Sequence, residues 1–153
     1  MIIYLNAKIN LGLNILRRRN DGYHDISSVF YPVSQLFDIL EIIPANTFSC
    51  SVSGFSIDVK QNICVKAFNL IQQNFGIDPV KIHLHKKIPI GAGLGGGSSD
   101  GAFTLIGLNQ IYNLQLSNLQ LKKYALQLGA DCPFFIDNTP QYVTGVGEKI
   151  IPI

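Results

Sequence analysis

The residues with the clearest chemical potential form a glycine-rich segment in the middle of the chain. Six of the 14 glycines fall within residues 91–101, between an apolar segment and a pattern typical of a helix. Glycine leaves backbone N–H groups uncovered, and a helix N-terminus adds unpaired donors and a favourable dipole. The segment therefore predicts an anion site suited to a triphosphate, to which Ser98 and Ser99 would add hydroxyl donors. A flexible surface loop is the alternative.

The common phosphate-binding motifs do not fit this segment. A dinucleotide-binding fold needs an acidic residue about 20 positions after its glycines, and residues 101–130 contain no Asp or Glu. A P-loop needs Gly-Lys-Ser/Thr at its end, and no lysine follows Gly97. The catalytic and metal-binding motifs of protein kinases are absent as well.

Asp131 is a candidate for the carboxylate that phosphoryl transfer usually needs. It lies in the sequence Leu-Gly-Ala-Asp-Cys-Pro-Phe-Phe, after a helix-ending glycine and among apolar residues. Backbone geometry rather than solvent would therefore hold it. The same position suits an aspartate that caps the following turn, and the sequence leaves both roles open.

Lys8 and Asn10 stand two residues apart in a segment, 8–16, where polar and apolar residues alternate. Alternation with period two predicts a strand, so both side chains would share one face, about 7 Å apart along the strand. The lysine could lower the pKa of a hydroxyl, orient a carboxylate or bind phosphate. A solvated lysine on an edge strand is the alternative.

An aromatic–histidine pair, Tyr23 and His24, follows a turn sequence of three arginines and Asn-Asp-Gly. Tyr23 could stack on a planar ring, and His24 could hydrogen-bond the edge of a base. A turn with incidental aromatic residues is the alternative. His83 and His85 alternate with apolar neighbours, which predicts the exposed face of a strand rather than metal ligands.

The elements that must position these residues follow from periodicity and turn signals. Strands are predicted over residues 8–16, 28–33, 37–43, 47–53 and 80–84, with a hairpin turn at 17–22. Helices are predicted over 62–75, 98–112 and 117–128. Strands dominate the first half and helices follow, so the fold class is α+β. The length of 153 residues suits one domain.

The composition excludes several function classes. Hydrophobic residues make up 47% of the chain and charged residues 14%, which excludes a disordered chain. A formal net charge of +2 gives no sign of nucleic acid or an anionic membrane as a partner. The three cysteines form no C-x-x-C pair, so a cytoplasmic protein is expected and a zinc site is not. No segment approaches transmembrane length.

Five sequence strings, taken in order, resemble the GHMP superfamily of small-molecule kinases. They are Ala-Lys-Ile-Asn-Leu from position 7, Arg-Arg-Asn-Asp-Gly-Tyr-His from 18, Pro-Ile-Gly-Ala-Gly-Leu-Gly-Gly-Gly-Ser-Ser-Asp from 89, Leu-Gly-Ala-Asp-Cys-Pro-Phe-Phe from 128 and Gly-Val-Gly-Glu from 145. The glycine segment alone indicates the superfamily. The second and fourth strings narrow the resemblance, which covers essentially the whole chain, to kinases of the non-mevalonate isoprenoid pathway.

The resemblance implies ATP-dependent phosphorylation of a hydroxyl on the methylerythritol part of a CDP-linked small-molecule substrate, with Mg²⁺ accompanying ATP and no dedicated metal ligand identified. Asp131 would be the base or hydroxyl-orienting group, with Lys8 as its partner. Asn10 would contact the substrate near its reacting end, and Tyr23 and His24 would hold the cytidine. The implied ATP-binding residues are Asn62 and Lys86 at the nucleoside and Pro89, Ile90, Gly91, Ala92, Gly93, Leu94, Gly95, Gly96, Gly97, Ser98 and Ser99 around the phosphates.

The resemblance also implies that residues 1–153 form a GHMP-kinase N-terminal domain, with a mixed β-sheet, helices on one side and a left-handed β-α-β unit. Family members continue into a second domain that closes the substrate cleft, and this chain is expected to lack it. Gly101 stands where the family usually has alanine, which would weaken the start of its helix. A nucleotide-binding fragment without turnover and a sister GHMP kinase for mevalonate, homoserine or a sugar remain alternatives, and the oligomeric state stays open.

Overall fold

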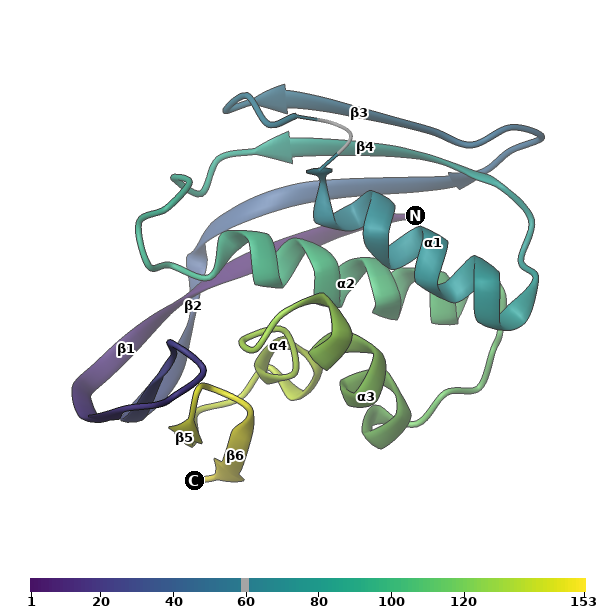
Figure 1. Cartoon of the computed structure of the whole chain (residues 1–153). Coiled ribbons are helices and arrows are strands. Elements are labelled where there is room, and N and C mark those ends of the chain that lie inside the picture. Colours follow the sequence, from purple (N-terminus) through teal and green to yellow (C-terminus); the bar gives the residue numbers. More distant parts are fainter. Residues whose placement is uncertain (59–60) are drawn as a thin grey trace.

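Figure 1 shows the computed structural model, in which helices cover one face of a six-stranded sheet. The structure describes residues 1–58 and 61–153. The strands are β1 (Ile2–Arg18), β2 (His24–Pro44), β3 (Ser49–Gly54), β4 (Val80–Lys86), β5 (Gln141–Gly145) and β6 (Lys149–Pro152). The helices are α1 (Ile63–Phe75), α2 (Gly96–Ile111), α3 (Asn118–Leu128) and α4 (Phe134–Asp137).

The sheet is mixed, which confirms the predicted α+β class. Its order is β3-β4-β2-β5-β6, with β1 paired to β2. β3 and β4 are parallel, and the other pairs are antiparallel. Helix α1 connects β3 to β4, so the chain contains the expected β-α-β unit, and its left-handed sense stays a prediction.

The first hairpin is longer than the sequence pattern indicates. β1 begins at Ile2 rather than at Lys8, and the segments predicted as two strands over 28–33 and 37–43 form the single strand β2. Register shifts between Asn6 and Ala7 and further along β1 let the two strands stay paired across irregular positions. Side-chain alternation breaks at such bulges, which explains why periodicity alone divides the strand.

The predicted helices are confirmed, and their ends have local causes. The Asn62 side chain caps α1 by accepting from the Cys64 N–H, and Gly76 ends it with a φ of 62°. Ser117 and Gln120 form a capping box at α3. The short helix α4 is absent from the prediction, because four residues are too few to show a period. Within the described residues, no helix is both long and apolar enough to cross a bilayer.

Gly101 has a packing role that propensity does not reveal. It is buried on α2, and a Cβ at this position would lie 2.9 Å from side-chain carbons of Ile63 at the start of α1. The absent side chain lets the two helices pack closely. Glycine at position 101 is therefore predicted to weaken the start of α2, but it also permits a close contact between α1 and α2.

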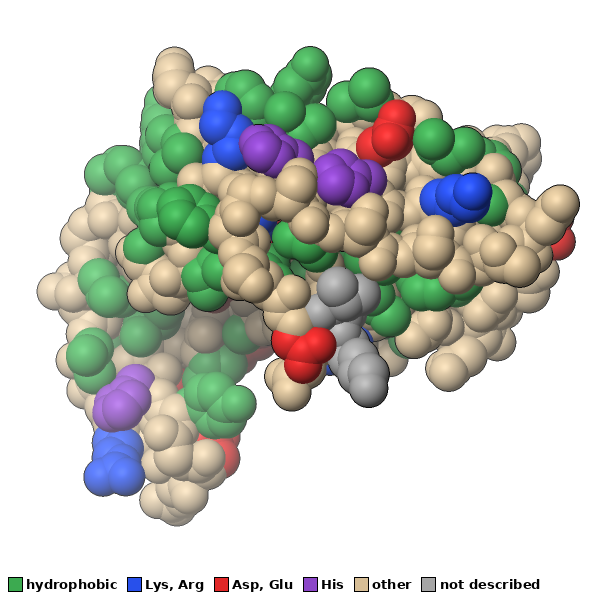
Figure 2. Space-filling view, turned by 90° about the horizontal axis from the view of Figure 1, so that it is seen from above, with side chains coloured by type: hydrophobic (Ala, Val, Ile, Leu, Met, Phe, Trp, Pro, Cys, Tyr) green, Lys and Arg blue, Asp and Glu red, His purple; other side chains and the backbone are tan. Residues whose placement is uncertain are grey.

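The hydrophobic core lies between the sheet and the helices, and the opposite face of the sheet is open. Along β4, burial alternates, with His83 and His85 half-buried on the open face. Both histidines hydrogen-bond the Ser53 hydroxyl, and Figure 2 shows two histidine side chains side by side at the surface. This arrangement confirms the prediction of an outward strand face. Lys86 stands on the other face, among buried residues, although it is charged.

Candidate active site

The glycine-rich segment connects the end of β4 to the N-terminus of α2 (Figure 1). Gly91, Gly93 and Gly95 have φ values of 72°, 74° and 70°, a region that residues with a Cβ rarely adopt. No side chain caps the N-terminus of α2. Its first backbone N–H groups therefore have no side-chain partner, which is the condition that an anion site at a helix N-terminus requires, and the site itself stays a prediction.

Lys8 and Asp131, far apart in the sequence, meet beside this segment. The Lys8 ammonium lies 3.4 Å from Asp131 Oδ2 and donates to Asn10 Oδ1 at 2.6 Å. It also lies 4.1 Å from the centre of the Phe30 ring. Lys8 is only 3% exposed, which rules out a solvated edge-strand lysine. The Asp131 side chain is 31% exposed, so its carboxylate can reach a molecule bound in front of it.

Backbone contacts hold Lys8 against the glycine-rich segment. The Lys8 N–H donates to the Leu94 carbonyl at 2.9 Å. A Cβ on Gly95 would lie 2.8 Å from Lys8 Cγ, so only glycine permits this approach. The Ser99 hydroxyl is buried and donates to the Asn6 carbonyl at 2.8 Å. It anchors α2 to β1 and does not point into the loop as an additional donor.

Asp131 is positioned by the segment between α3 and α4. Its carbonyl accepts from the Phe134 N–H at 3.3 Å, so the residue also belongs to the turn that opens α4. Asn6 and Asn138 exchange side-chain hydrogen bonds of 3.1 and 2.7 Å, which tie the end of α4 to β1. Gly147, in the turn between β5 and β6, comes so close that a Cβ would lie 2.8 Å from Asp131 Oδ1.

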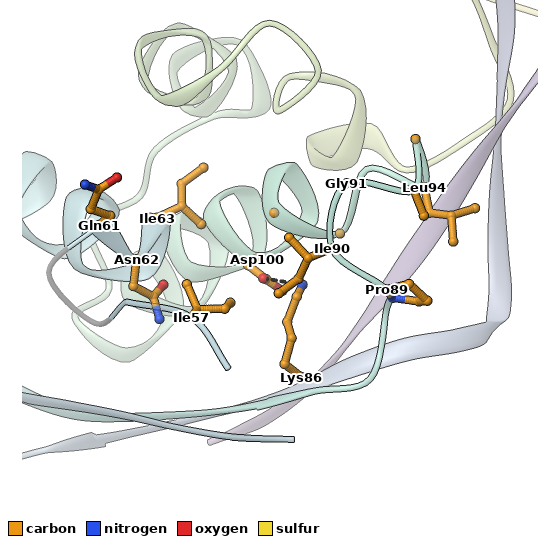
Figure 3. A pocket seen from close by; sticks show the side chains of 14 residues that line it. Ile57, Gln61, Asn62, Ile63, Lys86, Pro89, Ile90, Gly91, Leu94 and Asp100 are labelled. Carbon is orange, nitrogen blue, oxygen red and sulfur yellow. Dashed lines mark hydrogen bonds and ion pairs between the residues drawn. The ribbon is translucent and has the colours of Figure 1, made fainter. Parts of the chain in front are cut away.

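A cavity of about 310 Å³ lies between the glycine-rich segment, the end of β4 and the start of α1 (Figure 3). Asn62 and Lys86, expected near a nucleoside, are both in its wall. The lining residues are Ile57, Gln61, Asn62, Ile63, Lys86, Pro89, Ile90, Gly91, Ala92, Gly93, Leu94, Gly96, Gly97 and Asp100. Asn62 also caps α1, so one residue shapes both the helix start and the cavity wall.

Sequence reasoning does not identify two acidic residues that contact the cavity residue Lys86, and one of them, Asp100, also lines the cavity. Asp38 on β2 and Asp100 on α2 both contact the Lys86 ammonium, and all three residues are at most 3% exposed. Burial raises the pKa of Asp100 to about 8, although Lys86 opposes this shift. Burial would lower the pKa of Lys86, but the two carboxylates outweigh it and raise that pKa. The sequence signal that could have revealed Asp38 is an acidic residue within the largely apolar segment 37–43, which also contains Glu41.

Tyr23 and His24 lie at the far end of the β1–β2 hairpin, where both are exposed. Arg19 stiffens this end through ion pairs with Asp21 at 2.9 Å and Asp25 at 3.2 Å. In the strand register Lys8 faces Pro32, eight residues beyond His24, or about 26 Å along an extended strand. The structure therefore does not cluster Tyr23 and His24 with the Lys8–Asp131 pair.

Within residues 1–58 and 61–153, no group of three or more His, Cys, Asp or Glu side chains could hold a metal ion. Cys64 and Cys132 are buried, and burial raises the pKa of the Cys132 thiol to about 11. These two cysteines therefore behave as small apolar residues, as expected.

The structure thus places a glycine-rich loop, a helix N-terminus without a side-chain cap and a Lys8–Asp131 pair next to one another on an α+β domain. The family model of the GHMP kinases N terminal domain matches residues 62–138, half of the chain. The chain belongs to this family, and the resemblance found in the sequence is confirmed.

Several relatives carry a more specific name. A 4-diphosphocytidyl-2-C-methyl-D-erythritol kinase from Azobacteroides pseudotrichonymphae genomovar. CFP2 is 50% identical over 155 residues, which cover 100% of this chain and 58% of the relative. A kinase of the same name from Cytophaga hutchinsonii is 50% identical over 141 residues, covering 91% of this chain and 52% of the relative. The chain thus spans a little more than half the length of the curated relatives it matches.

Solved structures also resemble this chain, and one of them carries the same kinase name as the relatives. A crystal structure of 4-(cytidine 5'-diphospho)-2C-methyl-D-erythritol kinase matches with a TM-score of 0.86 and 38% identity, over 100% of this chain and 55% of that one. Mevalonate kinase from Methanococcus jannaschii matches with a TM-score of 0.74 and 17% identity, over 100% of this chain and 55% of that one. At such low identity the second likeness shows a shared fold alone.

Proposed function

We propose that this chain is the ATP-binding and catalytic part of a kinase that phosphorylates a hydroxyl of 4-diphosphocytidyl-2-C-methyl-D-erythritol. The observation that carries the proposal is the contact between Lys8 and Asp131 at 3.4 Å beside an uncapped helix N-terminus. The names of relatives that are half identical to the chain support the choice of substrate.

In the proposed reaction, the acceptor hydroxyl lies against the exposed oxygen of Asp131. The hydroxyl oxygen forms a bond to the γ-phosphorus of ATP as the bond from that phosphorus to the β–γ bridging oxygen breaks. The hydroxyl proton passes to Asp131, while ADP leaves with the bridging oxygen. Lys8 holds the carboxylate in place, and its positive charge stabilises the negative charge that develops on the transferred group.

The glycine-rich segment, residues 89–99, would bind the phosphates through its backbone N–H groups, and Asn62 and Lys86 would line the nucleoside cavity. Mg²⁺ would enter with ATP. This ion usually keeps several waters and takes most of its remaining ligands from substrate phosphates. A site without a preassembled group of three metal ligands among the described residues is compatible with that mode of binding.

The acceptor must be a long molecule if both the middle and the turn of the hairpin contribute to its binding. Tyr23 and His24 would hold the cytidine at the exposed end, and Asn10, hydrogen-bonded to Lys8, would contact the alcohol near the reacting hydroxyl. A nucleoside joined to a polyol through a diphosphate has this two-ended form. We propose that a second domain, as the resemblance implies for this family, would close the cleft over it.

The test is ADP release that depends on 4-diphosphocytidyl-2-C-methyl-D-erythritol, measured on the protein encoded by the complete reading frame. Asp131→Asn should reduce turnover by roughly 10²–10⁴-fold, the range for loss of a general base. Asp78→Asn, which changes an exposed carboxylate at the opposite end of β4, is the matched control and should keep full activity. Equal turnover in wild type and Asp131→Asn would refute the mechanism. Phosphorylation of mevalonate, homoserine or a sugar in place of this substrate would assign the chain to a sister kinase.

A further inference from the structure

The Asp38–Lys86–Asp100 group joins helix α2 to the paired strands β2 and β4. Asp38 is on β2, Lys86 ends β4 and Asp100 lies near the start of α2. The Lys86 ammonium contacts both carboxylates, at 2.7 Å in the case of Asp100. We refer to these three residues as the buried ion triad.

One half of the triad holds the beginning of the glycine-rich segment. Asp38 Oδ1 accepts from the backbone N–H groups of Lys87 at 2.5 Å and Ile88 at 2.8 Å. These are the residues with which the chain leaves β4. Since Asp38 is fully buried on the central strand β2, the entry into the loop is attached to the most constrained part of the sheet.

The other half holds the end of the segment. The Lys86 ammonium donates to the Asp100 carboxyl group on α2. A Cβ on Gly96, the first residue of α2, would lie 2.9 Å from Lys86 Nζ. The ammonium is therefore directly behind the first turn of the helix, whose N–H groups face the anion site. Figure 3 shows Lys86 and Asp100 joined at the inner wall of the cavity.

Folding alone does not explain why charged residues occupy this position. Removing two carboxyl groups and an ammonium from water carries a large desolvation penalty, and well-packed apolar residues often stabilise such a site equally well or better. One oxygen, Asp100 Oδ1, also has no hydrogen-bond partner within the described residues. An arrangement with this penalty needs a benefit other than stability.

We infer that the buried ion triad is a positioning device that clasps both ends of the glycine-rich segment, so that its N–H groups are arranged for ATP before ATP binds. The inference rests on the proposed function for the identity of the ligand. Asp38 fixes the entry, Asp100 fixes the exit, and Lys86 joins them. Preorganisation of this kind improves binding by reducing the loss of conformational entropy.

The variant Asp100→Leu tests whether the buried ion triad holds the glycine-rich segment in place. It leaves no charge unpaired, because Lys86 keeps Asp38 as its partner. We expect the ATP dissociation constant to rise about tenfold or more and amide hydrogen exchange over residues 91–99 to become faster. The CDP dissociation constant and the melting temperature should stay close to the wild-type values. Asp100→Asn retains an oxygen acceptor for Lys86 and should restore most of the ATP affinity.

Asp137→Leu is the matched control, because it breaks the half-buried ion pair of Asp137 with Lys122 and the hydrogen bonds from Asn118 and Gln141 without touching the segment. If Asp100→Leu fails to fold, the triple variant Asp38→Asn, Lys86→Met, Asp100→Leu takes its place, since it removes all three charges together. Wild-type ATP affinity and wild-type exchange over residues 91–99 in the folded variant would overturn the inference. A wild-type protein that binds no ATP would instead refute the proposed function, and the exchange measurement would still test the clasp.

Discussion

At the scale of single residues, Lys8 is defined by its surroundings more than by its type. Its stem is buried against Gly95, and its ammonium is held between Asn10, Asp131 and the Phe30 ring. A lysine side chain in this position has few alternative conformations, so its ammonium group stays beside Asp131. Such fixed charges stabilise a transition state without reorganisation.

Replacing Lys8 by Met should therefore impair catalysis more than substrate binding. We expect kcat to fall by roughly 10²-fold or more, comparable to the loss of a single preorganised donor, with a change of less than about threefold in the KM for ATP, because the loop N–H groups remain. Steady-state kinetics would show whether kcat falls while the KM for ATP stays nearly unchanged. Lys81→Met, on the open face of the sheet, is the control. A selective rise in the KM for ATP with unchanged kcat would contradict the assigned role.

Asp100 makes stability depend on pH. Its pKa is raised to about 8 in the folded chain, whereas a carboxyl in an unfolded chain titrates near pH 4. The folded state thus retains a proton that the unfolded state has released, so stability should fall as pH rises from about 4 to about 8 and level off above that range.

The comparison of wild type with Asp100→Asn isolates this contribution. Urea midpoints from about pH 5 to about pH 9 should fall with pH in wild type and fall less in Asp100→Asn, because the amide has no proton to lose. Parallel curves for the two proteins would show that Asp100 titrates normally.

At the scale of elements, the connection from β4 to α2 is the feature on which the site depends. It is bonded to β1 through the carbonyl of Leu94 and to β2 through Asp38. Its glycines differ in their surroundings. Gly95 has φ 70° and closely approaches Lys8 and Phe135, whereas Gly97 has nothing within 4 Å of a Cβ placed on it.

Two alanine substitutions should therefore have opposite consequences. Gly95→Ala should lower the free energy of unfolding by about 1–2 kcal/mol from the left-handed backbone alone, and by more because Lys8 and Phe135 must move. Gly97→Ala, in the first turn of α2, should be neutral or slightly stabilising, since alanine favours helix. Thermal unfolding of both variants checks this, and equal destabilisation would argue against a tight contact at Gly95.

At the scale of the whole molecule, the hairpin carries both ends of the proposed acceptor site. Figure 1 shows β1 and β2 extending together beyond the helices. Lys8, which contacts Asp131, lies near the middle of β1, and Tyr23 directly precedes β2 at the turn of the hairpin. An acceptor that reaches both positions must be extended. In the proposed mode of binding, this separation would give the cytidine end and the reacting end independent contributions to binding.

Tyr23→Ala should consequently weaken binding of the acceptor and leave ATP unaffected. Loss of a base–aromatic stack is worth about 1–3 kcal/mol, so the KM for 4-diphosphocytidyl-2-C-methyl-D-erythritol should rise roughly 5- to 150-fold. Tyr4→Ala is a matched control, because Tyr4 and Tyr23 are both 62% exposed and Tyr4 lies at the other end of β1. If the KM of Tyr23→Ala were unchanged, the cytidine would not bind at this end of the hairpin.

Much of this molecule follows from local sequence. The spacing of apolar residues predicts α1, α2 and α3, and the glycines of residues 91–97 predict the anion loop, because helix periodicity and positive φ are properties of short segments. The resemblance to GHMP kinases is also local, since it depends on five short strings. It implied a pairing of Lys8 with Asp131, and the contact is present in the structure.

Only the tertiary structure decided which charged residues are buried together. Asp38, Lys86 and Asp100 come from three separate elements, and none carries a local signal for the others; they meet because β2 and β4 are paired and α2 packs on them. Likewise, only the tertiary structure shows that Lys8 is buried rather than exposed. Burial and charge pairing depend on contacts between residues distant in sequence, and the pairing of β2 with both β1 and β4 sets those contacts here.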